Sequence, residues 1–396
     1  MRISTAQSFD TGIDSLQKRK LELDEAQRQL TTGKRVDRAS DDPAAAARAE
    51  RALAAQARHE ASQRAVEASR AVMQLTESAL ADAQELMQQA RELVAQAGNG
   101  SYTDGERAAL AVTLRGIRGQ LLSVANRPDG RGGYLFSGQG ASQPPFVDAP
   151  AGVAWRGTAG RIDVASGETL PVSTDGAATW LTAPTGNGVF ETRAVPGSAG
   201  AWIDAGRIAD PAALTGDTYT ITFGAGGSTY NVLRNGAATA LTDVAYASGK
   251  EIALDGWSVT VSGAPSAGDG FEVVPSTPTL GAFGVLDAVA SDLQTPLRTG
   301  SQIQQSVNHS LRDLDAVMTR MQLVRAGVGE TLARADGVES RLADATLAAQ
   351  TERSSAEDLD MVAAISAFQS KQTGYDAALQ SYATVRRMSL FDYLRT

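Results

Sequence analysis

The sequence predicts an α+β protein: its N- and C-terminal thirds form a long helical bundle or coiled-coil rod, and an antiparallel β domain is inserted between them. Apolar residues recur at heptad spacing near both ends of the chain. Ala, Gln and Arg dominate the outer thirds, whereas Gly, Pro, Thr and Val replace them between about residues 138 and 278. With 396 residues the chain is too long for one compact core, so we expect several domains.

The last segment, residues 358–396, carries an apolar row typical of a coiled coil. Its members follow at alternating steps of four and three residues, which puts them on one helix face: Met361, Ile365, Phe368, Gln372, Tyr375, Leu379 and Tyr382. The first segment, residues 1–40, repeats apolar residues every seven positions, with one more between the first two: Phe9, Leu16, Leu23 and Leu30, and Ile13. We therefore expect the two terminal segments to pair as a coiled-coil assembly element.

The first two helices have clear start and stop signals. The first is predicted over residues 8–30, ending near Gly33, which suits a C-terminal cap. The second is predicted to begin at Pro43, since proline is tolerated in a first turn, with Asp42 capping the free backbone donors. It should run to about Ala97. An apolar row recurs along it every seven residues, at Val66, Met73, Leu80, Met87 and Val94.

A third helix is predicted from Thr103, which forms a capping box with Glu106. It carries Leu110, Leu114, Ile117, Leu121 and Val124, and we expect it to fold back on the second helix as an antiparallel hairpin. The helical pattern stops near Pro128 and returns after Pro278. Residues 41–137 and 279–357 are thus the predicted N-terminal and C-terminal parts of the helical rod.

The middle of the chain is predicted to form two β lobes, residues 138–185 and 186–278. Short alternating runs bounded by Gly, Asp or Asn read as antiparallel strands at residues 218–223, 229–233 and 257–261. The glycine-rich residues 224–229 lack the lysine of a phosphate-binding loop and join two strands, so they are predicted to be a hairpin turn.

No residue pattern indicates catalysis, a cofactor or a metal. His59 and His309 are predicted to lie on solvated helix surfaces, since no further ligand stands at useful spacing. Ser15 and Lys18 match an S-x-x-K spacing, but inside a heptad helix, where chance explains it. The absence of cysteine excludes disulfides, thiolate ligands and cysteine nucleophiles. We therefore expect a protein that is not an enzyme and binds no cofactor.

Charge and hydropathy exclude further classes. The net charge is -9 and no block of Lys and Arg stands out, which argues against a nucleic-acid or anionic membrane surface. No uncharged apolar stretch is long enough to span a bilayer, and the first residues do not form a conventional secretory signal. The sequence is thus typical of a cytoplasmic protein or of one exported without a cleaved signal.

Several segments resemble the flagellin superfamily. Residues 30–36 (Leu-Thr-Thr-Gly-Lys-Arg-Val) and 40–44 (Ser-Asp-Asp-Pro-Ala) are similar to its amino-terminal signature, and residues 89–100 to the end of its long helix. Pro43 after the paired aspartates, residues 133–138 and residues 388–394 resemble the hook-filament junction branch of the superfamily. In the second lobe, residues 216–223 and 263–271 resemble a β module repeated among hook-associated proteins.

The resemblance implies a structural adaptor at the hook-filament junction of the bacterial flagellum. It implies export through the flagellar type III channel from the cytoplasm, and an extracellular location afterwards. The implied partners are a neighbouring hook-associated protein, flagellin, further copies in a ring, and an export chaperone on the last helix. The expected assembly interface comprises Phe9, Ile13, Leu16, Leu23, Leu30, Met361, Ile365, Phe368, Tyr375, Leu379, Tyr382, Leu390 and Phe391; the expected chaperone contacts are Ile365, Phe368, Leu379 and Tyr382.

Two alternatives remain at this point. The first alternative is flagellin, a structural protein of the same superfamily. Pro43 and the ending Phe391-Asp392-Tyr393-Leu394 argue against it. A secreted glycan-binding or enzymatic β module on a helical stalk is the other, and it would need a pocket with exposed tryptophan and paired acids.

Overall fold

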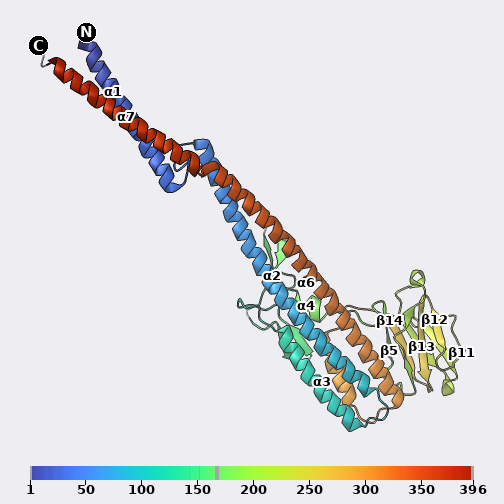
Figure 1. Cartoon of the computed structure of the whole chain (residues 1–396). Helices are drawn as coiled ribbons and strands as arrows, with labels where there is room; N and C mark the ends of the chain where they lie inside the picture. Colours follow the sequence, from blue (N-terminus) through green and yellow to red (C-terminus); the bar gives the residue numbers. More distant parts are fainter. Residues whose placement is uncertain (1, 142, 151, 166–168, 394–396) are drawn as a thin grey trace. The chain divides into compact units, whose positions relative to one another are not determined.

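The computed structural model describes residues 2–141, 143–150, 152–165 and 169–393. The chain divides into two compact units. One unit combines the residues up to Arg64 with those from Glu339 onward, and the other comprises Ala65–Val338. The main helices are α1 (Arg2–Thr32), α2 (Pro43–Ala97), α3 (Asp104–Ala125), α5 (Ala282–Gln294), α6 (Gly300–Glu357) and α7 (Met361–Tyr393) (Figure 1).

The predicted helix ends follow from local chemistry. Helix α2 has the predicted bounds, and Asp42 Oδ1 accepts hydrogen bonds from the backbone N–H of Ala44 and Ala45 at 3.1 and 3.0 Å. The capping box before α3 is present, because the Thr103 side chain accepts from the Glu106 N–H and the Glu106 side chain accepts from the Thr103 N–H. These hydrogen bonds satisfy backbone donors that the first turn of a helix leaves free.

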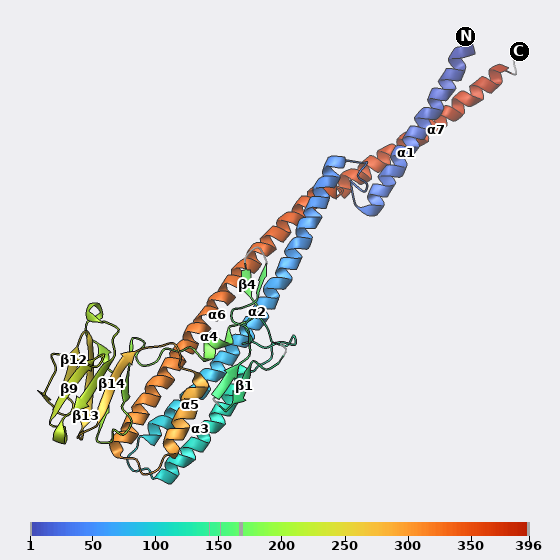
Figure 2. The ribbon, with the colours of Figure 1, turned by 180° about the vertical axis from the view of Figure 1, so that it is seen from behind.

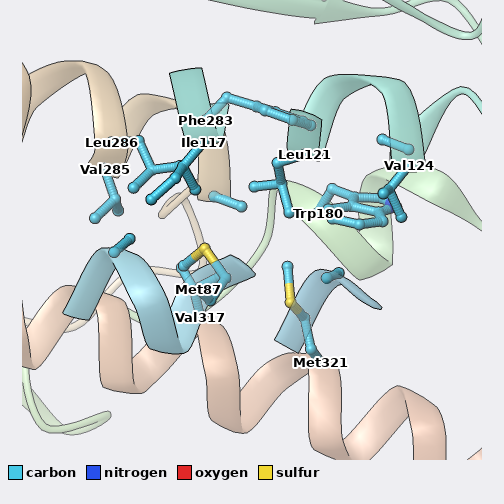
Figure 3. Packing of buried hydrophobic residues seen from close by; sticks show 14 of the residues in the cluster. Met87, Ile117, Leu121, Val124, Trp180, Phe283, Val285, Leu286, Val317 and Met321 are labelled. Carbon is cyan, nitrogen blue, oxygen red and sulfur yellow. The ribbon is translucent and has the colours of Figure 1, made fainter. Parts of the chain in front are cut away.

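The helices of the unit formed by Ala65–Val338 share one apolar core. The predicted α2 row is buried throughout, at Val66, Met73, Leu80, Met87 and Val94. Helix α3 lies closest to α5 rather than pairing with α2 alone. Figure 3 shows Met87, Leu121, Phe283 and Met321, from α2, α3, α5 and α6, converging in this core. The α3–α5 contact was not predicted, because residues 279–357 were expected to form one helical segment.

That segment breaks between Gln294 and Gly300. Pro296 cannot donate the hydrogen bond that would continue the helix, and Leu297 has a positive φ of 59°. The break turns the chain, so that α5 packs on α3 before α6 begins.

The described residues of the first β lobe bury their aromatic side chains in the helical core rather than in a separate cluster. Its strands are short two-stranded pairs, β1 (Phe146–Ala149) with β2 (Gly152–Trp155) and β3 (Asp163–Ala165) with β4 (Thr169–Pro171), followed by the short helix α4 (Gly176–Trp180). Phe136, Phe146 and Trp180 instead join the helical core, where the Trp180 ring stacks on Phe283 at 5.9 Å between centroids. With so few strands, this lobe buries its aromatic rings only against the helices.

The second lobe is an antiparallel domain with a separate core (Figure 2). One sheet has the order β10-β9-β8-β14-β5, with β11 also pairing with β9; the other has the order β12-β13-β6, with β7 also pairing with β13. The strands are β5 (Phe190–Ala194), β6 (Ala201–Ile203), β7 (Arg207–Ile208), β8 (Tyr219–Phe223), β9 (Thr229–Arg234), β10 (Ala237–Ala238), β11 (Val244–Ala245), β12 (Glu251–Leu254), β13 (Trp257–Gly263) and β14 (Gly270–Pro275). Residues 224–228 form the predicted turn between β8 and β9.

The second lobe is held to α6 by polar contacts. Gln305 Oε1 accepts a hydrogen bond from the Ile203 N–H at 2.8 Å, and Arg312 Nη1 donates to the Thr192 carbonyl at 3.0 Å. His309 belongs to this contact, because its Nε2 lies 3.9 Å from Glu191 Oε1 on β5; within α6 the same Nε2 lies 2.9 Å from Asp313 Oδ2, and Nδ1 lies 2.9 Å from Arg312 Nη2. The prediction that His309 is simply solvated was therefore wrong, since its ring bonds to charged neighbours.

Candidate assembly interface

The terminal helices α1 and α7 pair in an antiparallel orientation. A Cβ placed on Gly12 would lie 3.5 Å from Tyr382 Cδ2, whereas Lys371 Nζ donates to the Glu22 carbonyl at 3.4 Å, further along α1 and further back along α7. At the end of α1, the Leu359 N–H donates to the Gly33 carbonyl at 3.0 Å. The residue numbers thus rise on one helix as they fall on the other. The two helices lie side by side in both views of the chain (Figures 1 and 2).

On α1 the predicted row faces α7. Leu16, Leu23 and Leu30 are half-buried, and Ala26 between them is buried. Ile13 is 39% exposed, more than the three leucines of the row. The side chain of Phe9 lies outside the described residues, as do those of Leu390 and Phe391.

On α7 the row that faces α1 is rotated from the predicted one. Phe368, Tyr375 and Tyr382 are half-buried as a heptad row should be. The positions between them that turn toward α1 are Ala364, Lys371 and Ala378, instead of the predicted Ile365, Gln372 and Leu379. Small residues between the aromatic ones, together with Gly12 and Ala26 on α1, allow the two helices to approach closely.

The rotation leaves apolar side chains on the outside of the pair. Met361, Ile365 and Leu379 are 45%, 46% and 41% exposed, and Leu21 on α1 is 68% exposed. A row of exposed apolar side chains on adjacent helices is typical of a surface that binds another protein. The residues of α7 that face α1 were not predicted, although two alanines on the same helix face, Ala364 and Ala378, could have indicated them.

Two family models match the chain. Residues 3–141 match the bacterial flagellin N-terminal helical region, and residues 197–275 match the D2-like domain of flagellar hook-associated protein 1. The second match covers most of the second β lobe.

Among curated relatives, flagellar hook-associated protein 3 of Salmonella typhimurium is 32% identical over 152 residues, which is 38% of this chain and 48% of that protein. The alignment thus spans about half the length of this relative. The protein of the same name from Escherichia coli is 23% identical over 395 residues, 99% of both chains.

Two solved structures with significant similarity to the chain carry the same name or the name FlgL. The crystal structure of flagellar hook-associated protein 3 from Legionella pneumophila is 25% identical, with a TM-score of 0.70 over 74% of this chain and 94% of that one. A crystal structure of Xanthomonas campestris FlgL is 28% identical, with a TM-score of 0.69 over 77% of this chain and 99% of that one.

The helical termini, the inserted β domain and these matches make the chain similar to proteins of the flagellin superfamily. Within the superfamily the chain is similar to proteins named hook-associated protein 3 or FlgL, which resemble it over most of its length. In the part of the chain that the structure describes, none of the helices has the length and hydropathy that a bilayer crossing requires.

Proposed function

We propose that the chain is a structural adaptor between hook and filament, without enzymatic activity. The observation that carries the proposal is the exposed apolar row on a terminal helix pair, in a chain that resembles hook-associated protein 3 from end to end. Such a row has no use in an isolated subunit, where it costs solubility, but it is what a subunit needs in order to pack against neighbours.

The terminal pair assembles through its outward row. Met361, Ile365 and Leu379 on α7, with Ile13 on α1, contact neighbouring subunits, whereas Leu16, Leu23, Leu30, Phe368, Tyr375 and Tyr382 hold the pair together. The neighbours are copies of the chain in a ring, a hook-associated protein on the hook side, and flagellin on the filament side. Phe9, Leu390 and Phe391 were expected in the same interface, and their side chains lie outside the described residues.

Electron microscopy of a deletion strain tests this function. We expect cells that lack the protein to carry hooks without filaments and to release flagellin into the medium. Complementation with the full chain should restore filaments. If the deletion strain instead grew filaments that lacked only an outer feature, the adaptor role would be refuted. If the deletion strain had complete hooks and released no flagellin, the deleted chain would itself be the filament subunit, flagellin.

We further propose that an export chaperone covers α7 before export through the flagellar type III channel. An exposed apolar row is an aggregation hazard, and Ile365 and Leu379 are accessible in the free subunit. Phe368 and Tyr382 are half-covered by α1, so the chaperone must displace α1 to reach them.

Truncation tests the chaperone site. Removal of residues 358–396 should abolish binding of the export chaperone in a pull-down or by calorimetry, because all four expected contacts are lost. A matched deletion of the second lobe, residues 186–278, should leave the affinity unchanged, since that lobe has its own core. Equal binding by the two truncated proteins would contradict the assignment.

A further inference from the structure

Two breaks in the helices lie next to each other in the unit that contains the chain ends. The loop of residues 33–42 joins α1 to α2, and residues 358–360 separate α6 from α7. Lys34 and Asp358 form an isolated antiparallel bridge between them. The Arg35 N–H donates to the Glu357 carbonyl at 2.7 Å, and the Leu359 N–H donates to the Gly33 carbonyl at 3.0 Å.

These contacts provide hydrogen-bond partners for the last backbone carbonyls of α6. The last carbonyls of a helix have no partner within it, and they carry the negative end of the helix dipole. The Arg35 side chain meets both needs, because its Nη2 donates to the Ala356 carbonyl at 2.7 Å. Ala356 is fully buried, so its carbonyl requires a protein partner. Lys34 Nζ adds a second cation, 3.3 Å from Glu357 Oε2.

The same arginine reaches the start of α2. Arg35 Nη1 lies 3.3 Å from Asp42 Oδ2, and Asp42 caps the first turn of α2 with its other oxygen. The Ala45 N–H and then the Arg35 guanidinium hold the pKa of Asp42 below its usual value, so this carboxylate stays charged. Arg35 thus connects the carboxyl end of α6 with the amino end of α2. The loop is internally braced as well, since Asp41 Oδ2 accepts from the Arg38 N–H at 2.9 Å.

We propose that residues 33–36 form a clasp on the α6–α7 break and that Arg35 holds the clasp shut. While it is shut, the α1–α7 pair has one orientation relative to the adjoining ends of α2 and α6. When it opens, the two breaks act together as a hinge. The clasp gives a physical role to the Leu-Thr-Thr-Gly-Lys-Arg-Val segment and to the Asp-Asp-Pro sequence that follows it.

The clasp is easy to open. Its contacts are a few hydrogen bonds around an arginine side chain that is 44% exposed, and an ion pair with that exposure is weak. The proposal concerns a joint within one subunit and goes beyond the adaptor function. The clasp can therefore be tested on the isolated protein, so its failure would leave the adaptor function standing.

Hydrogen exchange on the full chain measures opening directly. Arg35→Met keeps the side-chain length but removes the donors and the charge. We expect the Leu359 amide to exchange about fivefold faster, which corresponds to about 1 kcal/mol of lost clasp stability. Arg38→Met is the matched control, because Arg38 is exposed in the same loop and its side chain makes none of the contacts described above. Its Leu359 exchange should equal that of the wild type.

Distance measurements report the hinge. The chain has no cysteine, so spin labels can be placed at Lys20→Cys on α1 and Glu50→Cys on α2 without removing native thiols. Arg35→Met should broaden this distance distribution. A second pair at Lys20→Cys and Asp376→Cys, within the α1–α7 pair, should keep its wild-type distribution.

Three results would overturn the clasp. Unchanged Leu359 exchange and an unchanged α1–α2 distribution in Arg35→Met would show that Arg35 holds nothing. Equal effects of Arg35→Met and Arg38→Met would show that any loss of charge in the loop suffices. Broadening of the α1–α7 distance would show that the terminal pair itself had come apart.

Discussion

Replacing Ile13 by lysine should abolish filament growth while the subunit is still folded and exported. Ile13 is 39% exposed in the subunit, so a lysine there keeps its charge in water and costs the free protein little. In the assembly proposed above the same position faces a neighbour, where an unpaired buried charge would cost several kcal/mol. In the proposed ring every subunit would carry the same change, so the loss would recur at each contact. Motility assays and electron microscopy of the complemented deletion strain measure the outcome.

The choice of residue separates assembly from export. Ile13 is not among the expected chaperone contacts, whereas Ile365 and Leu379 are expected to serve both purposes. Ser15→Lys is the matched control, since Ser15 is exposed on the same helix and is not part of the outward row. We expect filaments with the control and none with Ile13→Lys, with equal amounts of both proteins exported. Normal filaments with Ile13→Lys would contradict the assignment of this row to assembly.

Trp180→Ala should strongly destabilise the unit that contains the helical core and both β lobes. The Trp180 side chain is 1% exposed, stacks on Phe283 and meets Phe136 edge-on at 5.2 Å between centroids. Truncation of a buried tryptophan costs about 3–5 kcal/mol of unfolding free energy, because the lost transfer energy adds to that of the cavity. Phe146 and Trp180 place the first lobe in this cluster, so the lobe should lose its attachment to the helices as well.

Thermal unfolding followed by near-ultraviolet circular dichroism measures this loss. Trp202→Ala is the control, because Trp202 is half-buried in the second lobe, outside the cluster around Trp180. We expect a clearly smaller decrease in the transition temperature for Trp202→Ala than for Trp180→Ala. Equal decreases would show that the aromatic cluster does not join the first lobe to the helices.

Local features of the fold could be predicted from the sequence with accuracy. The start of α2 at Pro43, the capping box of Thr103 and Glu106, and the turn between β8 and β9 depend on residues a few positions apart. Cap chemistry and turn conformation are short-range effects, and the sequence displays them directly. The buried α2 row was also predictable, because an apolar residue recurs every seven positions over several helical turns, which chance would rarely produce.

The candidate interface was only partly predictable. The heptad spacing of Phe368, Tyr375 and Tyr382 indicated an apolar face on α7, but such a face is wider than the contact with one helix. Which side of it α1 covers depends on the sizes of the residues on both helices. The packing of the first lobe was not predicted for a similar reason, since no local pattern shows that Phe146 is buried against the helices.

The sequence by itself determined the class of the protein, the bounds of α2 and the cap of α3, and the division into helical termini and a β insertion. The tertiary structure decided which face of α7 turns toward α1, that the first lobe shares the helical core, and that the loop after α1 closes on the end of α6. The former depend on contacts between near neighbours in the chain. The latter depend on contacts between residues far apart in it, such as Arg35 and Ala356, which no local pattern records.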